Sequence, residues 1–439
     1  MLRLARLFSA AAPAIAKPTQ LAKCFADLQL ERTTQLALDK EFKYTDMSHV
    51  QQLVLTDQSQ QDMLVRAKTG TGKTLAFLVA ALQQAKFEPR KIPILVISPT
   101  RELAAQIARE ATRLCAFNKR RVCLAVGGTS RSVLVNQLTR GQTDILVATP
   151  GRLVDILSSV PEVLQRLSGL QVLVIDECDQ LLDMGFKQEM HEITSRVGTL
   201  RKTLLFSATL GDNIQQAAKS MLKPGHVHID TVPENETDTH LLIKQSSIVA
   251  SYKQHTQLIN QIVSKHQETE VFPKIVVFFQ TTKMVVLMSE VFAHLGVPVM
   301  QLHSKLDQTR RTRISDRFRK ARSGILFTSD VSARGVDYPD VTLVLSVGMP
   351  QSRDQYIHRI GRTGRAGKKG EAILLLNPFE KRFLESLGDL PIRPDLRFNP
   401  HAEQQDAEKS AKAVAAMEET DIEDRISLVM ASFGFRTVN

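Results

Sequence analysis

The chain has 439 residues, more than one hydrophobic core usually serves, so we expect two domains. Hydrophobic residues make up 43% of it, and no apolar run approaches the ~18 residues of a membrane span, which predicts a soluble globular protein. The formal net charge of +11 favours an anionic partner, most often a nucleic acid. The four cysteines form no CxxC pair, which argues against a zinc site or a disulfide framework: Cys24, Cys115, Cys123 and Cys178.

The first 23 residues, MLRLARLFSAAAPAIAKPTQLAK, carry four Lys or Arg residues and no acid. In a helix, Leu4, Leu7, Phe8, Ala11 and Ile15 would share one apolar face. An arginine-bearing, acid-free, amphipathic segment is typical of a mitochondrial transit peptide. We therefore predict a transit peptide over residues 1–24 and a location in the mitochondrial matrix. A disordered basic arm is the alternative interpretation.

From Met63 onward, short β-rich runs alternate with helical stretches: MLV, ILVISP, VCLAVGG, DILVATP, VLVIDE, TLLFSAT and HVHID. The polar stretch DTVPENETDTH precedes a second series: KIVVFFQT, VMQLHS, GILFTSD, VTLVLSV and EAILLLNP. This alternation predicts an α/β fold with two tandem parallel-sheet domains. The expected boundaries are 25–230 for the first domain, 231–240 for a linker, 241–379 for the second domain and 380–439 for a helical C-terminal extension.

The extension ends in DIEDRISLVMASF, in which Ile422, Ile426, Val429 and Phe433 recur at helical spacing. We expect this apolar face to dock on the second domain. Residues 395–439 hold nine acids and five Lys or Arg residues, so they are not a basic tether for a nucleic acid.

A glycine-rich stretch, AKTGTGKT, lies between the first predicted strand and the helical LAFLVAALQQ, the setting that a phosphate-binding loop requires. Gly70 and Gly72 would let backbone N–H groups close around phosphates at the helix N-terminus. Lys73 would reach the β- and γ-phosphates, and the Thr74 hydroxyl would bind Mg²⁺. The candidate nucleotide site is therefore this loop: Ala67, Lys68, Thr69, Gly70, Thr71, Gly72, Lys73 and Thr74.

A second acidic stretch, VLVIDECD, supplies the carboxylates that such a site needs. Asp176 follows a hydrophobic strand and would hold Mg²⁺, and Glu177 would orient the attacking water as a base. Cys178 lies between acids, which raise the pKa of a thiol and weaken it as a nucleophile. We predict that Cys178 is a small packing residue.

Together these motifs resemble the DEAD-box RNA helicases of the second helicase superfamily, from about Phe25 to Pro378. Within this family, the chain most resembles the mitochondrial members that act as RNA chaperones in intron splicing and translation. This closer resemblance rests on the predicted transit peptide, the sequence GVDYPDV and the helical C-terminal extension. The motifs that carry the resemblance are AKTGTGKT, PTREL (99–103), GG (127–128), TPGR (149–152), DECD (176–179), SAT (207–209), VFFQT (277–281), QTRR (308–311), SDVSARGVD (329–337) and YIHRIGRTGR (356–365).

The resemblance implies two RecA-like domains and a set of nucleotide contacts. Gln51, 22 residues before Lys73, resembles the glutamine that reads adenine, because a carboxamide can pair with N6 and N7 together. Gln52 is a rival for this role, and either Tyr44 or Phe42 could stack on the base. The family's Pro-Thr is replaced here by Met47-Ser48-His49. In the second domain, the resemblance assigns Asp337 to the ribose, Arg362 and Arg365 to arginine fingers that act when the domains close, and His358 to a bridge toward DECD.

The resemblance also implies an RNA path and a coupling element. RNA would be held through phosphates and 2′-hydroxyls, largely without sequence preference. The SAT segment would couple the nucleotide and RNA sites. The implied RNA contacts are Pro99, Thr100, Arg101, Gly127, Gly128, Thr149, Pro150, Gly151, Arg152, Arg334 and Gly335, and the implied coupling residues are Asp179, Ser207, Thr209 and His358.

We therefore expect a monomeric, RNA-stimulated ATPase that uses ATP and Mg²⁺ to melt short RNA duplexes. An ATP-gated clamp, in which holding RNA is the function and turnover only resets it, is the alternative. A DNA translocase is disfavoured, because the family reads the 2′-hydroxyl.

Overall fold

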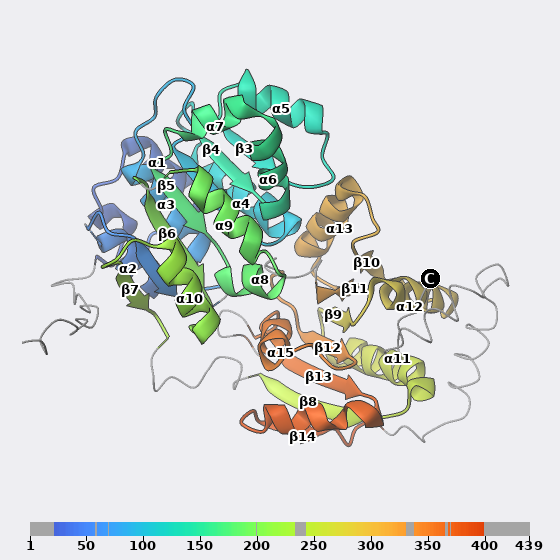
Figure 1. The fold of residues 1–439 in the computed structure, drawn as a ribbon. Helices are drawn as coiled ribbons and strands as arrows, with labels where there is room; N and C mark the ends of the chain where they lie inside the picture. Colours follow the sequence, from blue (N-terminus) through green and yellow to red (C-terminus); the bar gives the residue numbers. More distant parts are fainter. Residues whose placement is uncertain are drawn as a thin grey trace, which may run out of the picture. The chain divides into compact units, whose positions relative to one another are not determined.

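The computed structural model describes residues 22–398, apart from 58, 69, 199, 233–242, 331–337, 365–367 and 369. The chain divides into two compact units, Met1–Glu236 and Thr237–Asn439 (Figure 1). The predicted linker therefore lies mostly outside the described residues, as do the transit peptide up to residue 21 and the tail beyond Phe398. Within the described part of the chain, no helix is both long and apolar enough to cross a bilayer.

The first unit is built on a seven-stranded parallel sheet with the order β3-β4-β2-β5-β6-β1-β7. Its central strands are continuous aliphatic runs, since both faces of a parallel sheet are covered by helices. The strands are β1 (Met63–Arg66), β2 (Ile94–Ile97), β3 (Val122–Ala125), β4 (Ile145–Ala148), β5 (Val172–Ile175), β6 (Lys202–Ser207) and β7 (Val227–Asp230).

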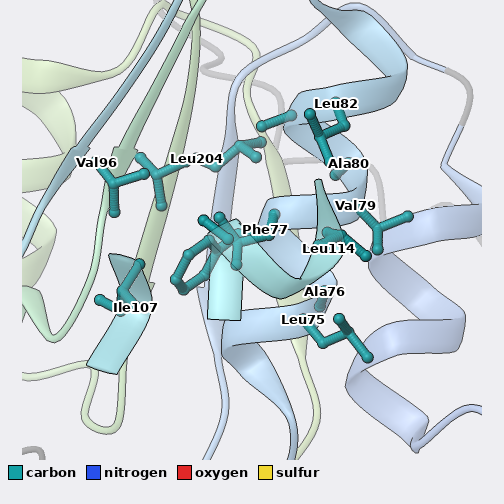
Figure 2. Close-up of a cluster of buried hydrophobic side chains, with 14 of the residues drawn as sticks. Leu75, Ala76, Phe77, Val79, Ala80, Leu82, Val96, Ile107, Leu114 and Leu204 are labelled. Carbon is teal, nitrogen blue, oxygen red and sulfur yellow. The ribbon is translucent and has the colours of Figure 1, made fainter. Parts of the chain in front are cut away.

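Helices cover both faces of this sheet, and alternate strand residues enter two separate cores. Ile94 and Val96 pack with α3 (Lys73–Gln84) and α4 (Arg101–Leu114) on one face, whereas Leu95 and Ile97 pack on the other. Figure 2 shows the first core around Phe77, whose ring meets that of Phe206 edge-on at 5.4 Å. The helical elements are η1 (Phe25–Asp27), α1 (Arg32–Ala37), η2 (Leu38–Phe42), α2 (His49–Thr56), α3 (Lys73–Gln84), α4 (Arg101–Leu114), α5 (Arg131–Thr139), α6 (Pro150–Ser159), α7 (Pro161–Leu167), α8 (Cys178–Asp183), α9 (Lys187–Arg196) and α10 (Asp212–Met221).

The second unit repeats this topology. Its sheet has the order β10-β11-β9-β12-β13-β8-β14, so both sheets follow the same sequence when strands are counted from the start of each unit. The strands are β8 (Lys244–Val249), β9 (Lys274–Phe279), β10 (Met300–Leu302), β11 (Gly324–Ser329), β12 (Leu343–Val347), β13 (Glu371–Leu376) and β14 (Ile392–Pro394). The helical elements are α11 (Tyr252–Thr269), α12 (Thr282–His294), α13 (Gln308–Lys320), α15 (Arg353–Ile360) and the 3-10 helix η5 (Pro378–Leu387).

The prediction of two parallel-sheet domains is confirmed, but two strands of the second unit, β8 and β14, were not predicted. β8 reads KQSSIV, and its buried Gln245 accepts a hydrogen bond from the Tyr356 hydroxyl at 3.1 Å. β14 lies in the segment assigned to the helical extension, and it pairs with β8 as the seventh strand. Both strands lack the run of apolar residues by which the other strands were predicted, since β8 contains polar residues and β14 contains a proline.

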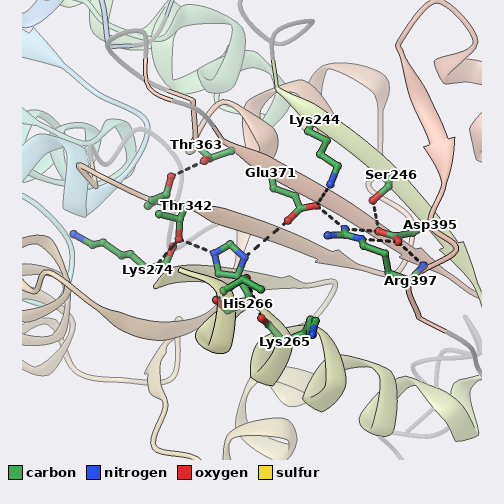
Figure 3. A network of polar contacts seen from close by, with 12 residues as sticks. Lys244, Ser246, Lys265, His266, Lys274, Thr342, Thr363, Glu371, Asp395 and Arg397 are labelled. Carbon is green, nitrogen blue, oxygen red and sulfur yellow. Dashed lines mark hydrogen bonds and ion pairs between the residues drawn. The ribbon is translucent and has the colours of Figure 1, made fainter. Parts of the chain in front are cut away.

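A polar network joins the residues after β14 to the first residues of β8 and β13 (Figure 3). Arg397 forms ion pairs with Glu371 and, at 2.6 Å, with Asp395. The Ser246 hydroxyl donates to Asp395 at 2.7 Å. Burial opposes the charge of Asp395, but the hydrogen bonds from Arg397 and Ser246 hold its pKa below the usual value. These contacts fasten the end of the described chain to the second unit.

Candidate nucleotide and RNA site

The glycine-rich loop leads from β1 into α3, as the sequence predicts. Gly70 and Gly72 have φ angles of 79° and 90°, a left-handed conformation that favours glycine. The Thr71 hydroxyl donates to the Lys68 carbonyl at 2.8 Å and closes the turn. Ala67 is buried and Thr74 lies in the first turn of α3, whereas Thr69 is outside the described residues.

Lys73 is the first residue of α3, and its side chain is buried. Its ammonium nitrogen has no hydrogen-bond partner in the described part of the chain. A buried, unsatisfied charge is costly unless a ligand compensates it. The helix N-terminus adds backbone N–H groups that face the same space. The loop therefore fits an anionic phosphate group.

Gln51 connects helix α2 to this loop. Its amide nitrogen donates to the Gly72 carbonyl at 3.1 Å, and its amide oxygen accepts from the Ser48 N–H at 2.8 Å. A Cβ added at Gly72 would come within 2.5 Å of the Gln51 nitrogen, so glycine is needed here for space as well as for conformation. A carboxamide has two donors and two acceptor lone pairs, so one of each is left for a base. This geometry is compatible with the predicted adenine contact.

The alternatives for the base site are distinguished by their surroundings. Gln52 donates instead to the Met47 carbonyl at 3.1 Å, away from the loop. The Phe42 ring is covered by the Arg113 guanidinium, which lies 4.3 Å from the ring centroid. Tyr44, by contrast, is 53% exposed, so its ring is accessible to a base. Gln51 and Tyr44 are therefore the better candidates to contact a base.

The acidic motif begins where β5 ends. Asp176 is buried, and its Oδ1 accepts from the Glu177 N–H at 3.0 Å. Burial raises the pKa of the Asp176 carboxyl, and the nearby Lys73 ammonium partly opposes this. Glu177 has a φ of 49°, a left-handed conformation that is strained for a residue with a side chain. Such strain commonly marks a functional site, and here it orients a buried carboxylate.

The residues around the motif are compatible with Mg²⁺ bound together with a nucleotide. Within the described ranges, no three or more His, Cys, Asp and Glu side chains converge on one point. Mg²⁺ typically takes one or two protein ligands and completes its shell with water and phosphate. Thr74 and Asp176 provide suitable oxygens for that role.

Cys178 begins α8 and is 1% exposed within the core of the first unit. Burial, with a smaller contribution from Asp179, raises the pKa of its thiol to about 12. The flanking acids, from which the sequence predicts a raised pKa, are thus the smaller cause, and desolvation is the larger one. The position fits the predicted packing role.

Asp179 links the acidic motif to the SAT segment. Its Oδ2 accepts from the backbone N–H of Ala208 at 3.0 Å and from that of Thr209 at 3.2 Å. The Thr209 N–H also approaches the Ser207 hydroxyl at 3.3 Å. The structure thus joins Asp179, Ser207 and Thr209 at the ends of β5 and β6, as the resemblance implies.

The three motifs assigned to RNA in the first unit form one cluster. The Arg101 guanidinium lies against Gly127, where an added Cβ would come within 2.6 Å of it. Arg152 donates to the Val126 carbonyl at 3.1 Å and to the Thr129 carbonyl at 3.0 Å, on either side of the glycine pair. Arg152 therefore positions the glycine turn in addition to any RNA contact. Of the other predicted contacts, Pro99, Thr100, Thr149 and Pro150 are buried at helix starts, and Gly128 and Gly151 are exposed.

The second unit places fewer of the predicted residues. Arg362 is buried, and its Nε donates to the His358 carbonyl at 3.1 Å. Arg334, Gly335, Asp337 and Arg365 lie outside the described residues. A pair that the sequence did not reveal joins the buried Arg359 to the half-buried Asp330, to which Arg359 donates through Nε at 2.7 Å and through Nη2 at 2.6 Å. The spacing of HRIGRTGR suggested function for its arginines, but could not show which of them points inward.

Comparisons with known proteins agree with this geometry. A DEAD/DEAH box helicase profile matches residues 48–217, and a helicase conserved C-terminal domain profile matches residues 254–367. The chain is 43% identical over 357 residues to DEAD-box ATP-dependent RNA helicase 26 of Oryza sativa subsp. japonica, covering 80% of this chain and 67% of that protein. It is 44% identical over 363 residues to DEAD-box ATP-dependent RNA helicase 31 of Arabidopsis thaliana, covering 80% of this chain and 51% of that one.

The chain thus spans about half to two thirds of the length of these relatives. Among solved structures, it resembles Mss116p bound to ssRNA and AMP-PNP, with a TM-score of 0.83, 29% identity, and coverage of 95% of this chain and 87% of that one. The matched profiles contain the glycine-rich loop, the acidic motif and the arginine motif described above. The chain belongs to the DEAD-box family of ATP-dependent RNA helicases.

Proposed function

We propose that this chain is an RNA-stimulated ATPase that grips a single RNA strand and melts short duplexes. The observation that carries the proposal is the buried Lys73 ammonium, which has no partner within the described residues and lies near Asp176. The same strand ends carry Asp179 and, through it, the SAT segment. The proposed phosphate site and the proposed coupling element therefore share one edge of the sheet.

The residues of the first unit divide the work of ATP hydrolysis. Bound ATP with Mg²⁺ supplies a γ-phosphoryl group whose transfer to water is strongly favourable. Gln51 would select adenine, and Lys73 would neutralise charge that develops on the phosphate oxygens. Glu177 would orient the attacking water and accept its proton. We expect Arg362 of the second unit to be required for turnover, as the arginine motif implies.

Strand separation is proposed to be local. Stacking contributes roughly 1.4 kcal/mol per base-pair step, taking the value for DNA. Gripping a few nucleotides can therefore disrupt only a few pairs, and the remainder must dissociate thermally. We expect efficient separation up to about ten pairs and a steep fall with duplex stability. A rate that stays constant as the duplex lengthens severalfold would show processive translocation and contradict this mechanism.

A paired measurement separates this function from an ATP-gated clamp. Unwinding of a short duplex and ATP-dependent retention of labelled single-stranded RNA are measured on one preparation. A helicase separates strands within the lifetime of its RNA complex. A clamp keeps the RNA bound for much longer than one cycle of ATP hydrolysis takes, and it leaves the duplex intact.

The site of action is proposed to be the mitochondrial matrix, where the protein would assist RNA folding, splicing or translation. Support comes from the acid-free, arginine-bearing segment up to Lys23, and from the sequence GVDYPDV, which resembles that of mitochondrial members of the family. Import into isolated mitochondria tests this, with a variant lacking residues 1–24 as the control. Import of both forms, or of neither, would contradict the assignment.

A further inference from the structure

Three connections of the first unit carry more positive charge than their topology requires. They join α3 to β2 (85–93), α4 to β3 (115–121) and α5 to β4 (140–144). Together they hold seven Lys or Arg residues and two acids, so their net charge is +5 in a chain of +11. The matching connections of the second unit, which precede β9, β10 and β11, hold one cation and one acid. The shared strand order therefore does not account for the charge.

The exposed cations of these connections lie on one edge of the sheet. The connections end at the starts of β2, β4 and β3, which are neighbouring strands about 4.8 Å apart. The glycine-rich loop and the acidic motif lie at the opposite edge, where strands end, about 10 Å away along a strand such as β2. We call these exposed cations the strand-start patch: Lys86, Arg90, Lys119, Arg121 and Arg140.

The protein does not neutralise the patch. Among the described residues, no ion pair or side-chain hydrogen bond involves any of its five cations. The two other cations of the connections are used internally, since Lys91 donates to the Ser168 hydroxyl at 2.9 Å and Arg120 pairs with Glu31 at 2.6 Å. Of the two acids of the connections, one is buried and the other, Glu88, is exposed. The patch therefore keeps a positive excess.

A buried arginine fastens the backbone that carries the patch. Arg166 of α7 donates to the Arg90 carbonyl at 3.1 Å and to the Gly141 carbonyl at 2.8 Å, which joins two of the connections. The third is joined through Asp144, whose carboxylate accepts from the Arg121 N–H at 2.6 Å. Arg90 has a φ of 62°, a left-handed conformation that is strained for a residue with a side chain. Such strain commonly marks a functional site.

Helix stability does not explain the patch. A cation is favoured at a helix C-terminus by the helix dipole, but only within the last turn. Arg140 directly follows α5 and could gain from this effect, whereas Arg90 and Arg121 lie well beyond the ends of α3 and α4. Their charges also repel other cations. Burial and, to a smaller extent, the Arg90 charge lower the pKa of the Arg166 guanidinium, although Asp144 opposes this. An anionic ligand would convert the repulsion into binding.

The chemistry of the patch favours an RNA backbone over a protein or a membrane. Protein interfaces depend on apolar or aromatic anchors, and membrane surfaces need an apolar face. The two aromatic rings of these connections already contact cations: Arg120 lies 3.8 Å from the centroid of Phe87, and Lys40 lies 5.8 Å from that of Phe117. Three of the five exposed cations are arginines, whose planar guanidinium groups match phosphate oxygens.

We propose that the strand-start patch binds the phosphate backbone of RNA segments that flank the strand held at the opposite edge of the sheet. This inference rests on the proposed RNA-binding function and adds a second surface to it. The patch would keep the protein on a structured RNA while the other edge binds and releases a single strand, which raises the local concentration of further strands. Its contribution is electrostatic and independent of sequence.

The test compares variants of the full chain. The patch variant replaces Lys119, Arg121 and Arg140 by Gln. A charge-preserving variant replaces Arg121 and Arg140 by Lys. The control variant replaces by Gln one lysine and two arginines that are exposed elsewhere and have no ion pair among the described residues: Lys187, Arg382 and Arg393. The patch and control variants therefore lose the same charge.

Each variant is measured with two RNAs. One is a single strand of about ten nucleotides, within the length that a single-strand site commonly covers. The other is the same strand extended by a hairpin. The affinity for each RNA is measured as a function of salt, together with the ATPase activity that each RNA stimulates.

The salt dependence gives the expected result. Each phosphate contact contributes about 0.9 to the slope of log K against log salt on a duplex. We expect the patch variant to lose about 2.7 units of slope for the extended RNA, so that raising salt about fourfold weakens the parent about 40-fold more than the variant. Affinity for the short strand, and the ATPase it stimulates, should stay within about twofold of the parent, because the patch lies at the other edge. The charge-preserving and control variants should keep the parent's slope.

Four results would overturn the inference. Equal loss for both RNAs would place the patch in the single-strand site. Equal loss in the control variant would show a general effect of net charge, and equal loss in the charge-preserving variant would show a structural effect. An unchanged slope in the patch variant would leave the patch without a role in RNA binding, and loss of binding to vesicles of anionic phospholipid in that same variant would make it a membrane surface. Failure of the parent to bind either RNA would instead reject the proposed function.

Discussion

The two units share one strand order but differ in the segment that connects their first strand to the next helix. In the first unit, β1 leads into the glycine-rich loop and to Lys73, whose ammonium nitrogen has no hydrogen-bond partner among the described residues. In the second unit, β8 leads directly to α11. The amide oxygen of Gln254 accepts two hydrogen bonds from Ser251, one from its backbone N–H at 3.0 Å and one from its hydroxyl at 2.7 Å. That helix start is closed by the protein's own side chains. The same topology therefore forms a phosphate site only where glycines and a lysine are present, so function follows from the site and not from the fold.

The two units also differ in how they use buried charge. In the first unit, Lys73 and Asp176 lie near one another at the strand ends, and the ammonium has no hydrogen-bond partner in the described part of the chain. In the second unit, Arg359 forms a bidentate pair with Asp330, directly after the end of β11. Arg397 pairs with Glu371 at the start of β13 (Figure 3). The charge of Lys73 is available to a ligand, whereas these charges of the second unit hold its elements together, as the pair of Lys202 with Asp57 at 3.5 Å does within the first unit.

The largest expected effect comes from removing the base proposed for the first unit. Glu177→Gln preserves size and hydrogen bonding but removes the carboxylate, so kcat should fall about 10²–10⁴-fold while ATP and RNA binding persist. Steady-state ATPase and nucleotide binding check this. Turnover close to that of the parent would mean that another group positions the water.

The matching change in the second unit should affect stability instead. Asp330→Asn leaves the buried Arg359 without its charge partner, which should lower the free energy of unfolding of that unit by about 3–5 kcal/mol. Glu268→Gln, which removes the exposed partner of Lys265, is the control and should change it by less than about 1 kcal/mol. Denaturant unfolding measures both. Equal effects would show that the Arg359–Asp330 pair is no stronger than a surface pair.

A smaller effect is expected at the base site. If Gln51 reads adenine, Gln51→Ala should reduce the preference for ATP over GTP about tenfold, within the range of about 1–3 kcal/mol for a bidentate base contact. Gln52→Ala should leave the preference unchanged, since that amide donates to Met47. The ratio of kcat/KM for the two nucleotides is the measurement. Equal use of ATP and GTP by the parent would remove the basis of the assignment.

The sequence predicted the elements whose patterns are strong. Continuous aliphatic runs predicted β2, β4 and β5, because strands buried on both faces tolerate little else. β8 was missed because its buried residues include Gln245 and two serines, whose polar groups are satisfied by partners such as Tyr356 and Asp395. Those partners lie more than a hundred residues away, so no local pattern reveals them.

The site was predicted to a similar extent. The loop from Ala67 to Thr74 and the pair Asp176 and Glu177 could be placed, because their spacing follows the chemistry of phosphate binding. The position of Arg152 against the carbonyls of Val126 and Thr129, and the contact between Gln51 and Gly72, could not. Both depend on which way a side chain turns after the fold has formed.

The smallest expected effect concerns the thiol beside the acidic motif. If activity in the first unit belongs to its charged groups, Cys178→Ala should change RNA-stimulated ATPase by no more than a few-fold. Burial raises the pKa of this thiol to about 12, so at pH 8 only about one molecule in 10⁴ carries the thiolate. The thiolate becomes abundant only as the pH rises through about 12. Cys115 and Cys123 are similarly buried, with thiol pKa values of about 11 and about 12.

Alkylation of the folded protein checks this reasoning independently of mutagenesis. Cys24 is only partly buried, and although its hydrogen bond to Asp46 raises its pKa, a reagent can reach it. On the full chain, with residues 1–24 retained, we expect a small alkylating agent at pH 8 to modify Cys24 alone, with no loss of ATPase, and to modify all four cysteines after unfolding. Peptide mass analysis identifies the modified positions. Two results would show that the thiol takes part in the reaction: rapid labelling of Cys178 in the folded state, or a hundredfold loss of turnover in Cys178→Ala. The functional difference between the two units would then depend on this thiol as well as on their charged residues.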